Sequence, residues 1–538
     1  MQLSVNWAAH PSPSVIRSLG YNPVVVVLLS VMALGFLAFC GAFLALAPIL
    51  VGLLMGLIAF LVVFFLLFAK VAPGAPAWVR AMFLIVIGHM VLASGFAGIA
   101  LPFGSAPIPI TDIVLAWALM MCLWMQLGTR QHVRLPMAIW VYAGWVVFNL
   151  AIHLPADYEE HGLSAARDGI RFLEHLTIIP GYVALSLALS KGEPGMRWLR
   201  AAVLVLALSL AVYGLLSPAQ TFMYENSPAF PGIQKWTPVL GNYQTWPMVG
   251  LVALFAGLAW RWSLHGRLKG WQWALVLALA LSGLTAFAML QSRAGYVFTG
   301  MALFILLMIG GQGRQVVLML SFMLACAVAL LAIEVSGVEI KGRVGTLSLT
   351  GVVDHVRSLT GESRSQEFQG AAGGISQRKA WREYSLHLWS ESAQTRVIGI
   401  GMGQVLTDLT VTGAEGKEVA VQDPHNSFVT TLTRAGMVGL TAFMGVMLWV
   451  LYMGWVGYRR SKDTNRPLAA FFLTLLMFQV YSIVDAWGQP HYEVSHYVVP
   501  SFFIYGAAWA IWDHFIKPAQ EAKRKKLEQL IMVRSGAN

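Results

Sequence analysis

Residues 23–69 read PVVVVLLSVMALGFLAFCGAFLALAPILVGLLMGLIAFLVVFFLLFA, and no charged residue interrupts them. A helix needs roughly 20 apolar residues to cross the hydrocarbon core of a bilayer, so this tract is too long for a single crossing. We expect two spans, separated by a break between Gly41 and Pro48, because proline ends or kinks a helix. The tract therefore predicts a helical membrane protein.

The whole composition agrees with that prediction. Of 538 residues, 57% are hydrophobic and only 11% are charged, which is too little charge to cover the surface of a water-soluble protein of this length. The fold class expected is an all-α polytopic membrane protein with about 14 transmembrane helices, 12–14 being plausible. Beyond residue 69 the spans are expected near 80–100, 109–127, 135–153, 171–190, 199–216, 247–262, 272–291, 295–311, 315–334, 428–456, 467–486 and 496–515.

Lys and Arg in alternate loops predict the orientation of these spans. Basic loops such as TRQHVR and YRRSKDTNR alternate with less basic or acidic ones such as ADYEEHG. Because cytoplasmic loops of membrane proteins are enriched in Lys and Arg, both termini are expected in the cytoplasm. The chain then divides into N-terminal spans, one large extracytoplasmic loop with amphipathic helices, C-terminal spans and a basic cytoplasmic tail, at residues 1–334, 335–427, 428–515 and 516–538.

Charge and cysteine content exclude other classes of function. The net charge of +11 comes from short loops and the tail, as membrane orientation requires, so we expect no nucleic-acid partner. Cys40, Cys122 and Cys326 all lie within expected spans and lack the spacing of metal ligands. We therefore expect no metal and no cofactor. In the large loop, ISQRKAWREYSLHLWSES (residues 375–392) has Trp381, Tyr384 and Leu388 at helical spacing, which predicts an amphipathic helix against the bundle or the membrane.

Ionisable residues in the expected spans lie close to their outer ends. They are Asp112, Arg171, Glu174, Arg293, Glu334, Arg434 and Asp485. An ion-coupled transporter would place such groups near the middle of the bilayer. The distribution favours an enzyme or receptor that opens to the outside, and it leaves a transporter as an alternative.

The stretch QDPHNSFVTTLTRAGMVGL (residues 422–440) places His425 and Asn426 where a polar loop meets a span. A neutral histidine can accept the proton of an attacking hydroxyl group. Arginines can grip the oxygens of a diphosphate in pairs and stay charged at any physiological pH. This combination suits transfer from a diphosphate-linked donor.

The motif around His425 also resembles that of a known superfamily. In HNSFVTTLTRAGMVG, His425 and Asn426 are followed by nine residues, Gly436, two residues and Gly439. Upstream, SQRKAWREYSLHLW leads into VIGIGMGQV, and SRAGYVF occurs at residues 292–298. The order and spacing resemble the O-antigen ligase and polysaccharide polymerase superfamily, of the Wzy/WaaL type, over about residues 375–445.

The resemblance implies an activity, an architecture and a location. It implies a GT-C-like membrane glycosyltransferase that needs no metal and inverts the anomeric centre, with His425 as the base. The implied donor is a glycan linked to undecaprenyl diphosphate, and the implied acceptor is a hydroxyl group of another glycan or of the lipid A core. The implied place is the bacterial inner membrane with the active site facing the periplasm. A chain-length regulator is a possible further partner.

The resemblance and the position of each arginine suggest substrate-binding residues. Arg293 is the first choice for the diphosphate, although the family often has Leu four positions later, where this chain has Val297. Arg171 is the second choice, with an ion pair to Asp168 or Glu174 as its alternative role.

Three further residues belong to the block that resembles the family. Arg378 precedes the GIGMG turn, and no specific role follows from its position. Arg434 could serve substrate binding or helix-to-helix pairing. Asn426 could orient His425, contact sugar, or cap the span that begins near Ser427.

The long outer loop and additional N-terminal spans favour a polymerase of exopolysaccharide or O-antigen repeat units. A ligase that joins glycan to lipid A core or to a protein remains an alternative within the same chemistry. A transporter or flippase for a lipid-linked or anionic solute is the alternative from another class.

Overall fold

The structure is a computed structural model that describes most of the chain after residue 74. The described residues are 75–103, 106–127, 133–215, 229–232, 235–238, 282–283, 293–310, 348–357, 366–407, 410–412, 418–420 and 423–519, with single positions in 320–335 and 521–529. The spans expected within 23–69 and 247–262, and nearly all of those expected at 272–291 and 315–334, lie outside this part.

Helices make up nearly all of the described chain, and the strands form three short hairpins. The helices are α4 (Ala77–Ala97), α5 (Ile110–Leu127), α6 (Met137–His161), α7 (Leu163–Leu173), η2 (Glu174–Thr177), α8 (Ile178–Ser190), α9 (Glu193–Leu215), α13 (Arg293–Gly310), α15 (Leu349–Arg357), α16 (Gln366–Ser390), α17 (Ala393–Ile398), α18 (Ser427–Ser461), α19 (Arg466–Gly488), α20 (Ser495–Ile511) and the π-helical turn η5 (Trp512–Ile516). The antiparallel strand pairs are β1 (Ala100–Phe103) with β2 (Ala106–Pro109), β3 (Ala229–Gly232) with β4 (Lys235–Pro238), and β5 (Thr410–Thr412) with β6 (Glu418–Ala420).

Six segments of the described part are long and apolar enough to cross a membrane. They are Ala77–Ala97, Ile110–Leu127, Met137–His161, Leu163–Ser190, Ser427–Ser461 and Arg466–Gly488. The all-α, polytopic character predicted from the sequence is therefore confirmed, whereas the total of fourteen spans and a GT-C-like arrangement stay predictions.

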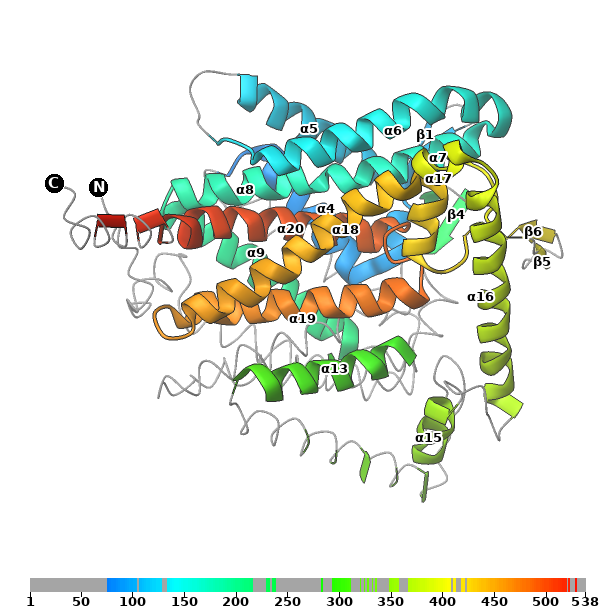
Figure 1. The fold of residues 1–538 in the computed structure, drawn as a ribbon. Helices are drawn as coiled ribbons and strands as arrows, with labels where there is room; N and C mark the ends of the chain where they lie inside the picture. Colours follow the sequence, from blue (N-terminus) through cyan, green and yellow to red (C-terminus); the bar gives the residue numbers. More distant parts are fainter. Residues whose placement is uncertain are drawn as a thin grey trace.

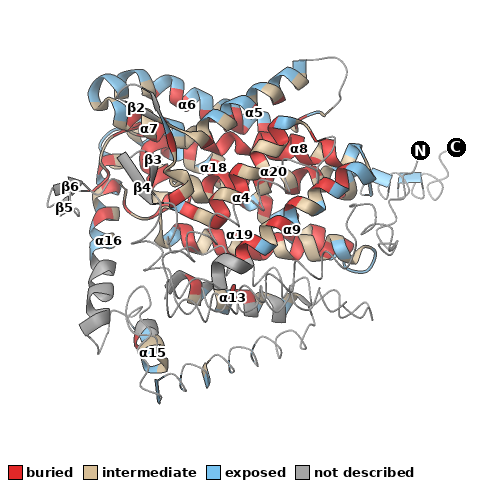
Figure 2. Ribbon diagram, turned by 180° about the vertical axis from the view of Figure 1, so that it is seen from behind, coloured by how far each residue is buried: buried red, intermediate tan, exposed pale blue. Residues whose placement is uncertain are grey.

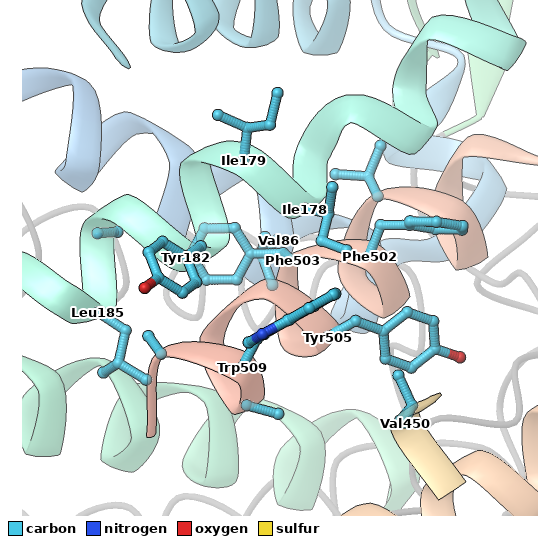
Figure 3. Packing of buried hydrophobic residues seen from close by; sticks show 14 of the residues in the cluster. Val86, Ile178, Ile179, Tyr182, Leu185, Val450, Phe502, Phe503, Tyr505 and Trp509 are labelled. Carbon is cyan, nitrogen blue, oxygen red and sulfur yellow. The ribbon is translucent and has the colours of Figure 1, made fainter. Parts of the chain in front are cut away.

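The long helices lie side by side in one bundle, with α20 in its interior (Figure 1). Helices α8 and α20 come into close contact through two glycines. A Cβ atom on Gly181 would lie 2.3 Å from the carbonyl oxygen of Phe503, and one on Gly506 would lie 2.0 Å from that of Ile178. Around this contact, Tyr182, Phe502 and other large side chains fill the core (Figure 3).

Burial differs sharply between the inside and the outside of the bundle (Figure 2). Helices α5 and α6 present large apolar side chains on their outer faces, among them Met120, Trp124, Leu127, Val141 and Phe148. In a water-soluble protein so large an apolar surface would promote aggregation, whereas in a membrane it contacts lipid. The chain is a multi-pass membrane protein.

Helices α16 and α17 and the hairpin β5–β6 lie at the end of the bundle opposite η5, and α16 runs across that end (Figure 1). The amphipathic helix expected within 375–392 is the second half of α16, which begins earlier than expected, at Gln366. Trp381 and Leu388 are buried as expected, and Ser385 is buried between them while Tyr384 is half-buried.

The span expected at 171–190 begins earlier than predicted. Instead of beginning at residue 171, the helical segment begins with the amphipathic helix α7, in which Ala165, Asp168 and Gly169 are buried. The sequence ARDGIR, residues 166–171, carries three charges, which are unfavourable inside an apolar bundle. Asp168 is nevertheless accommodated there because an arginine from a distant helix pairs with it.

Candidate active site

His425 has a backbone conformation that is unusual for a residue other than glycine. Its φ is +50°, in the left-handed region. The side chain of Asp423 holds this turn, since its Oδ1 accepts a hydrogen bond from the His425 N–H at 3.0 Å. Strained backbone of this kind is concentrated at functional sites, where the surroundings fix it.

Asn426 fixes the other side of the turn as the N-cap of α18. Its Oδ1 accepts hydrogen bonds from the backbone N–H groups of Phe428 and Val429, both at 3.1 Å. Its Nδ2 donates to the carbonyl oxygen of Trp487 at 3.1 Å, which ties α18 to the end of α19. The capping role considered for Asn426 is therefore present in the structure, and both polar atoms of its amide are engaged.

The imidazole ring of His425 is half-buried and lies against α16. Its centroid is 5.5 Å from that of Trp381, with 33° between the ring planes. Nδ1 is buried and has no hydrogen-bond partner among the described residues. Burial lowers the pKa of His425, with Arg378 adding to that effect, while Asp423 and a hydrogen bond with Gln489 oppose it. The ring is therefore neutral at pH 7 and can accept a proton.

Two arginines of α16 bind the end of α19 next to this ring. Arg378 donates from Nη1 to the carbonyl oxygen of Gly488 at 2.9 Å, and Arg382 donates from Nη2 to that of Trp487 at 3.1 Å. Of the predicted arginines whose side chains the structure describes, Arg378 is thus the one whose charge acts on the pKa of His425. The last carbonyls of a helix lack partners within it, so they are suitable acceptors for these cations.

Glu493, in the loop before α20, is a carboxyl group that the sequence analysis missed. Its Oε2 accepts a hydrogen bond from Ser427 Oγ at 2.6 Å, and Ser427 Oγ in turn accepts one from the Tyr492 N–H at 3.0 Å. Its Oε1 is buried without a partner among the described residues. Burial, followed by the charge of Asp423, raises the pKa of Glu493 to about 8. This carboxyl group is therefore mostly protonated at pH 7.

A glycine-rich turn follows α17 and packs against the N-terminal part of α18. Gly399, Gly401 and Gly403 have φ values of +85°, +92° and +85°, and a Cβ on Gly399 would lie 2.2 Å from the backbone of Arg434. Such φ values and such a close approach require glycine.

The backbone break at Gly436 makes carbonyl oxygens of α18 available to accept hydrogen bonds from the glycine-rich turn. Its φ of +66° breaks α18, which leaves the carbonyl oxygens of the preceding turn without helical partners. Ile400 N–H then donates to the Thr433 oxygen at 2.9 Å, and Gly401 N–H donates to the Arg434 oxygen at 3.1 Å.

Arg434 is held inside the bundle by an acidic residue of α7. Its Nη2 lies 2.9 Å from Asp168 Oδ2, and its guanidinium also donates to the carbonyl oxygens of Gly401 and Gln404 at 3.3 and 3.2 Å. Arg171 Nη1 lies 4.0 Å from Asp168 Oδ1, so the ion pair weighed for it is present at long range. Both arginines thus share one carboxylate, and Arg434 has the helix-to-helix pairing considered for it.

Arg293 is the first residue of α13, and its side chain lies outside the described part of the structure. Helix α13 contacts α19, and Trp487 lies at the C-terminal end of α19. Within the described residues, no group of three or more His, Cys, Asp or Glu side chains is placed to hold a metal ion.

The loop that contains Glu493 carries a sequence signal of its own. GQPHYEVSH, residues 488–496, contains a second Pro-His pair and a glutamate between two spans, and resembles QDPHN in composition. Its His491 is fully buried, with Nδ1 2.8 Å from Asp485 Oδ2. Polar residues at the outer ends of two successive spans indicate a shared site, whereas each loop alone does not.

Comparison with known families gives one match in this region. Residues 275–444 match the family model Wzy_C, described as O-Antigen ligase. The match includes His425, Asn426, Arg434 and both glycines of the spacing pattern, and it also includes Arg293 and Arg378. No curated protein matches the chain.

Proposed function

We propose that this membrane protein, which matches the O-antigen ligase family model over residues 275–444, is an enzyme that transfers glycan from undecaprenyl diphosphate to an acceptor hydroxyl group. We place this reaction at the extracytoplasmic face of the bacterial inner membrane. The observation that carries the proposal is the buried Nδ1 of His425, which has no hydrogen-bond partner among the described residues and belongs to a ring whose pKa is lowered by burial and by the nearby Arg378.

In this reaction His425 removes the proton of the acceptor hydroxyl as its oxygen attacks the anomeric carbon of the donor sugar. The bond from that carbon to the diphosphate oxygen breaks, and undecaprenyl diphosphate leaves with the electron pair. Attack from the face opposite the leaving group inverts the anomeric centre. No metal is required by this proposal, because arginine can neutralise the diphosphate.

The arginines have different roles in the proposal. Arg293 binds the diphosphate, since it begins a helix of the matched domain that packs on α19. Arg378 adds positive charge near His425 and keeps its pKa low. Arg434 and Arg171 support the site indirectly by holding the glycine turn and α7 around Asp168.

We propose further that the acceptor is a second lipid-linked repeat unit, so that the enzyme is a polymerase of exopolysaccharide or O-antigen. The long extracytoplasmic segment at 335–427, followed by the spans at 428–515, supports this choice, because a growing chain has to be accommodated outside the bilayer. The ligase alternative differs only in the acceptor. The family match favours an enzyme over a transporter or flippase.

The test uses purified full-length protein in proteoliposomes with lipid-linked repeat units as the only substrate. A ladder of products is expected for a polymerase, whereas product that forms only after addition of lipid A core identifies a ligase. His425→Ala is expected to lower the rate at least 100-fold, since general base catalysis typically contributes 10²–10⁴-fold. Near-normal product from correctly inserted His425→Ala protein would refute the role of the base.

A further inference from the structure

Trp487 combines a tightly held backbone with an open side chain. The residue is 62% exposed. Its carbonyl oxygen accepts hydrogen bonds from Asn426 Nδ2 and Arg382 Nη2, both at 3.1 Å. The next carbonyl, of Gly488, is held by Arg378. The backbone of Trp487 is therefore held next to the turn that carries His425, the neighbour of Asn426.

Arg382 extends the polar side of this surface. The Cζ of its guanidinium lies 5.8 Å from the centre of the Trp487 ring, within the range of a cation–π contact. Arg382 Nε is buried and has no hydrogen-bond partner among the described residues. A guanidinium carries five N–H donors, and the bond to the Trp487 carbonyl uses one of them.

An indole face beside a guanidinium matches the chemistry of a sugar ring. The hydrogens of the C–H groups on one face of a pyranose carry a partial positive charge. They therefore pack well against the face of an aromatic ring, which carries a partial negative charge. The hydroxyl groups at the rim of the same sugar accept hydrogen bonds from N–H donors, which an arginine supplies in a planar fork. Lipid tails contain no hydrogen-bond acceptors, so they cannot bind such donors.

Exposed tryptophans in membrane proteins also anchor spans at the lipid headgroups, and the chain contains a useful comparison. Trp455 is 40% exposed, and Arg459 lies over its ring at 5.6 Å. That pair belongs to one turn of α18, and it is near the end opposite His425. Trp487 differs because its arginine comes from α16, outside the spans, and because its carbonyl oxygen accepts hydrogen bonds both from that arginine and from Asn426, in the turn that carries His425.

We propose that Trp487 and Arg382 form a sugar-binding subsite that holds a ring of the glycan substrate next to His425. This inference rests on the proposed function, and it identifies residues that bind the glycan substrate of that reaction. The shared chemistry is a sugar ring with an open C–H face, which either the donor or the acceptor glycan can supply.

The experiment measures binding of the free repeat-unit oligosaccharide, released from the cell's own polymer and without lipid, to purified full-length protein. Saturation-transfer NMR and calorimetry report the affinity. Trp487→Ala and Arg382→Ala are each expected to weaken binding about tenfold, an effect of the size reported for aromatic contacts. Trp487→Phe, which keeps an aromatic face, should retain most of the affinity. Trp455→Ala is the matched control and should bind as the wild type does.

Initial rates distinguish the two sources of the sugar, with the concentrations of a short-lipid acceptor and of the donor varied separately. If the subsite holds the acceptor, Trp487→Ala raises the KM for the acceptor and leaves that for the donor unchanged, and the reverse holds for a donor sugar. Wild-type affinity of correctly inserted Trp487→Ala and Arg382→Ala would overturn the subsite. Should Trp487→Ala fail to fold, a wild-type affinity of Arg382→Ala overturns it equally.

Failure of the subsite and failure of the proposed function give different results. His425→Ala is expected to bind the oligosaccharide normally and to make no product. Oligosaccharide binding without any transfer by the wild type would refute the proposed reaction and leave the subsite in place. Transfer by the wild type with no effect of the Trp487 variants would refute the subsite and leave the proposed reaction in place.

Discussion

At the scale of single residues, the charges around His425 act on its pKa in opposite directions. Arg378 lowers the pKa and Asp423 raises it, while burial is the largest influence and lowers it. A general base works only when it is deprotonated, so activity falls as the pH drops through its pKa. For the wild type this fall is expected below pH 6.5, the ordinary value for histidine.

Variants of the two charged neighbours should shift that fall in opposite directions. Arg378→Gln removes a lowering influence, so the inflection in kcat/KM should move to higher pH. Asp423→Asn removes a raising influence, and its inflection should move to lower pH. The amide of Asn keeps an oxygen that can accept the His425 N–H bond, so the turn is retained. Shifts of the same sign in both variants, measured over pH 4.5–8 with a stable lipid-linked substrate, would contradict the assignment of His425 as the titrating base.

At the scale of elements, the kink in α18 makes a prediction about stability. At Gly436 the φ is +66°, and an added Cβ would lie 2.2 Å from the carbonyl oxygen of Val397. Gly436→Ala should therefore destabilise the protein by about 2–4 kcal/mol, through backbone strain and the clash with α17. Gly445, in the same helix, has no atom within 4 Å of such a Cβ.

Gly445→Ala serves as the matched control for that experiment. It should be neutral or slightly stabilising, because alanine favours a helix by about 1 kcal/mol over glycine. Thermal unfolding in detergent compares the two variants. Equal melting temperatures for both would mean that the kink at Gly436 is not required by the fold.

Several elements were predictable because their signals are local. Proline and capping residues mark span ends, as at Asn465, whose side chain accepts from the Leu468 N–H at 3.2 Å. The prediction of 467–486 thus agrees closely with α19, Arg466–Gly488. The burial of Asp168 was not predictable, because its partner Arg434 is distant in sequence and only the fold brings them together.

The candidate site shows the same division. His425 and Asn426 could be selected from one short motif with a polar-to-apolar boundary. Trp487 and Arg382 could not, because their significance lies in contacts between α16, α19 and the turn before α18, and Glu493 had only the weaker signal of a second polar loop. Propensity and hydropathy describe each segment separately, and they contain no information on which loop ends meet.

At the scale of the whole molecule, the arrangement predicts which side of the membrane each end of the bundle faces. Helix α16 and the β5–β6 hairpin lie at one end, and the basic residues Arg459 and Arg460 end α18 towards the other. Because Lys and Arg favour the cytoplasm, the end with His425 should be extracytoplasmic.

Single cysteines in a background without the three native ones test this orientation. Thr412→Cys, on β5, should react with a membrane-impermeant maleimide in intact cells with a permeable outer membrane. Asp463→Cys, just after α18, should react only after lysis. The reverse pattern of labelling would invert the topology and move the reaction to the cytoplasmic face.

The break at Gly436 divides α18 into two parts that contact different neighbours. The first part, which follows directly on His425, is hydrogen-bonded to the glycine turn through Ile400 and Gly401, whereas the second runs through the bundle to Ser461. A change in bilayer thickness that tilts the long second part can be absorbed at the break. We therefore expect His425 to keep its position relative to the glycine turn while the lipid around the second part varies, which would insulate the proposed transfer site from changes in the bilayer.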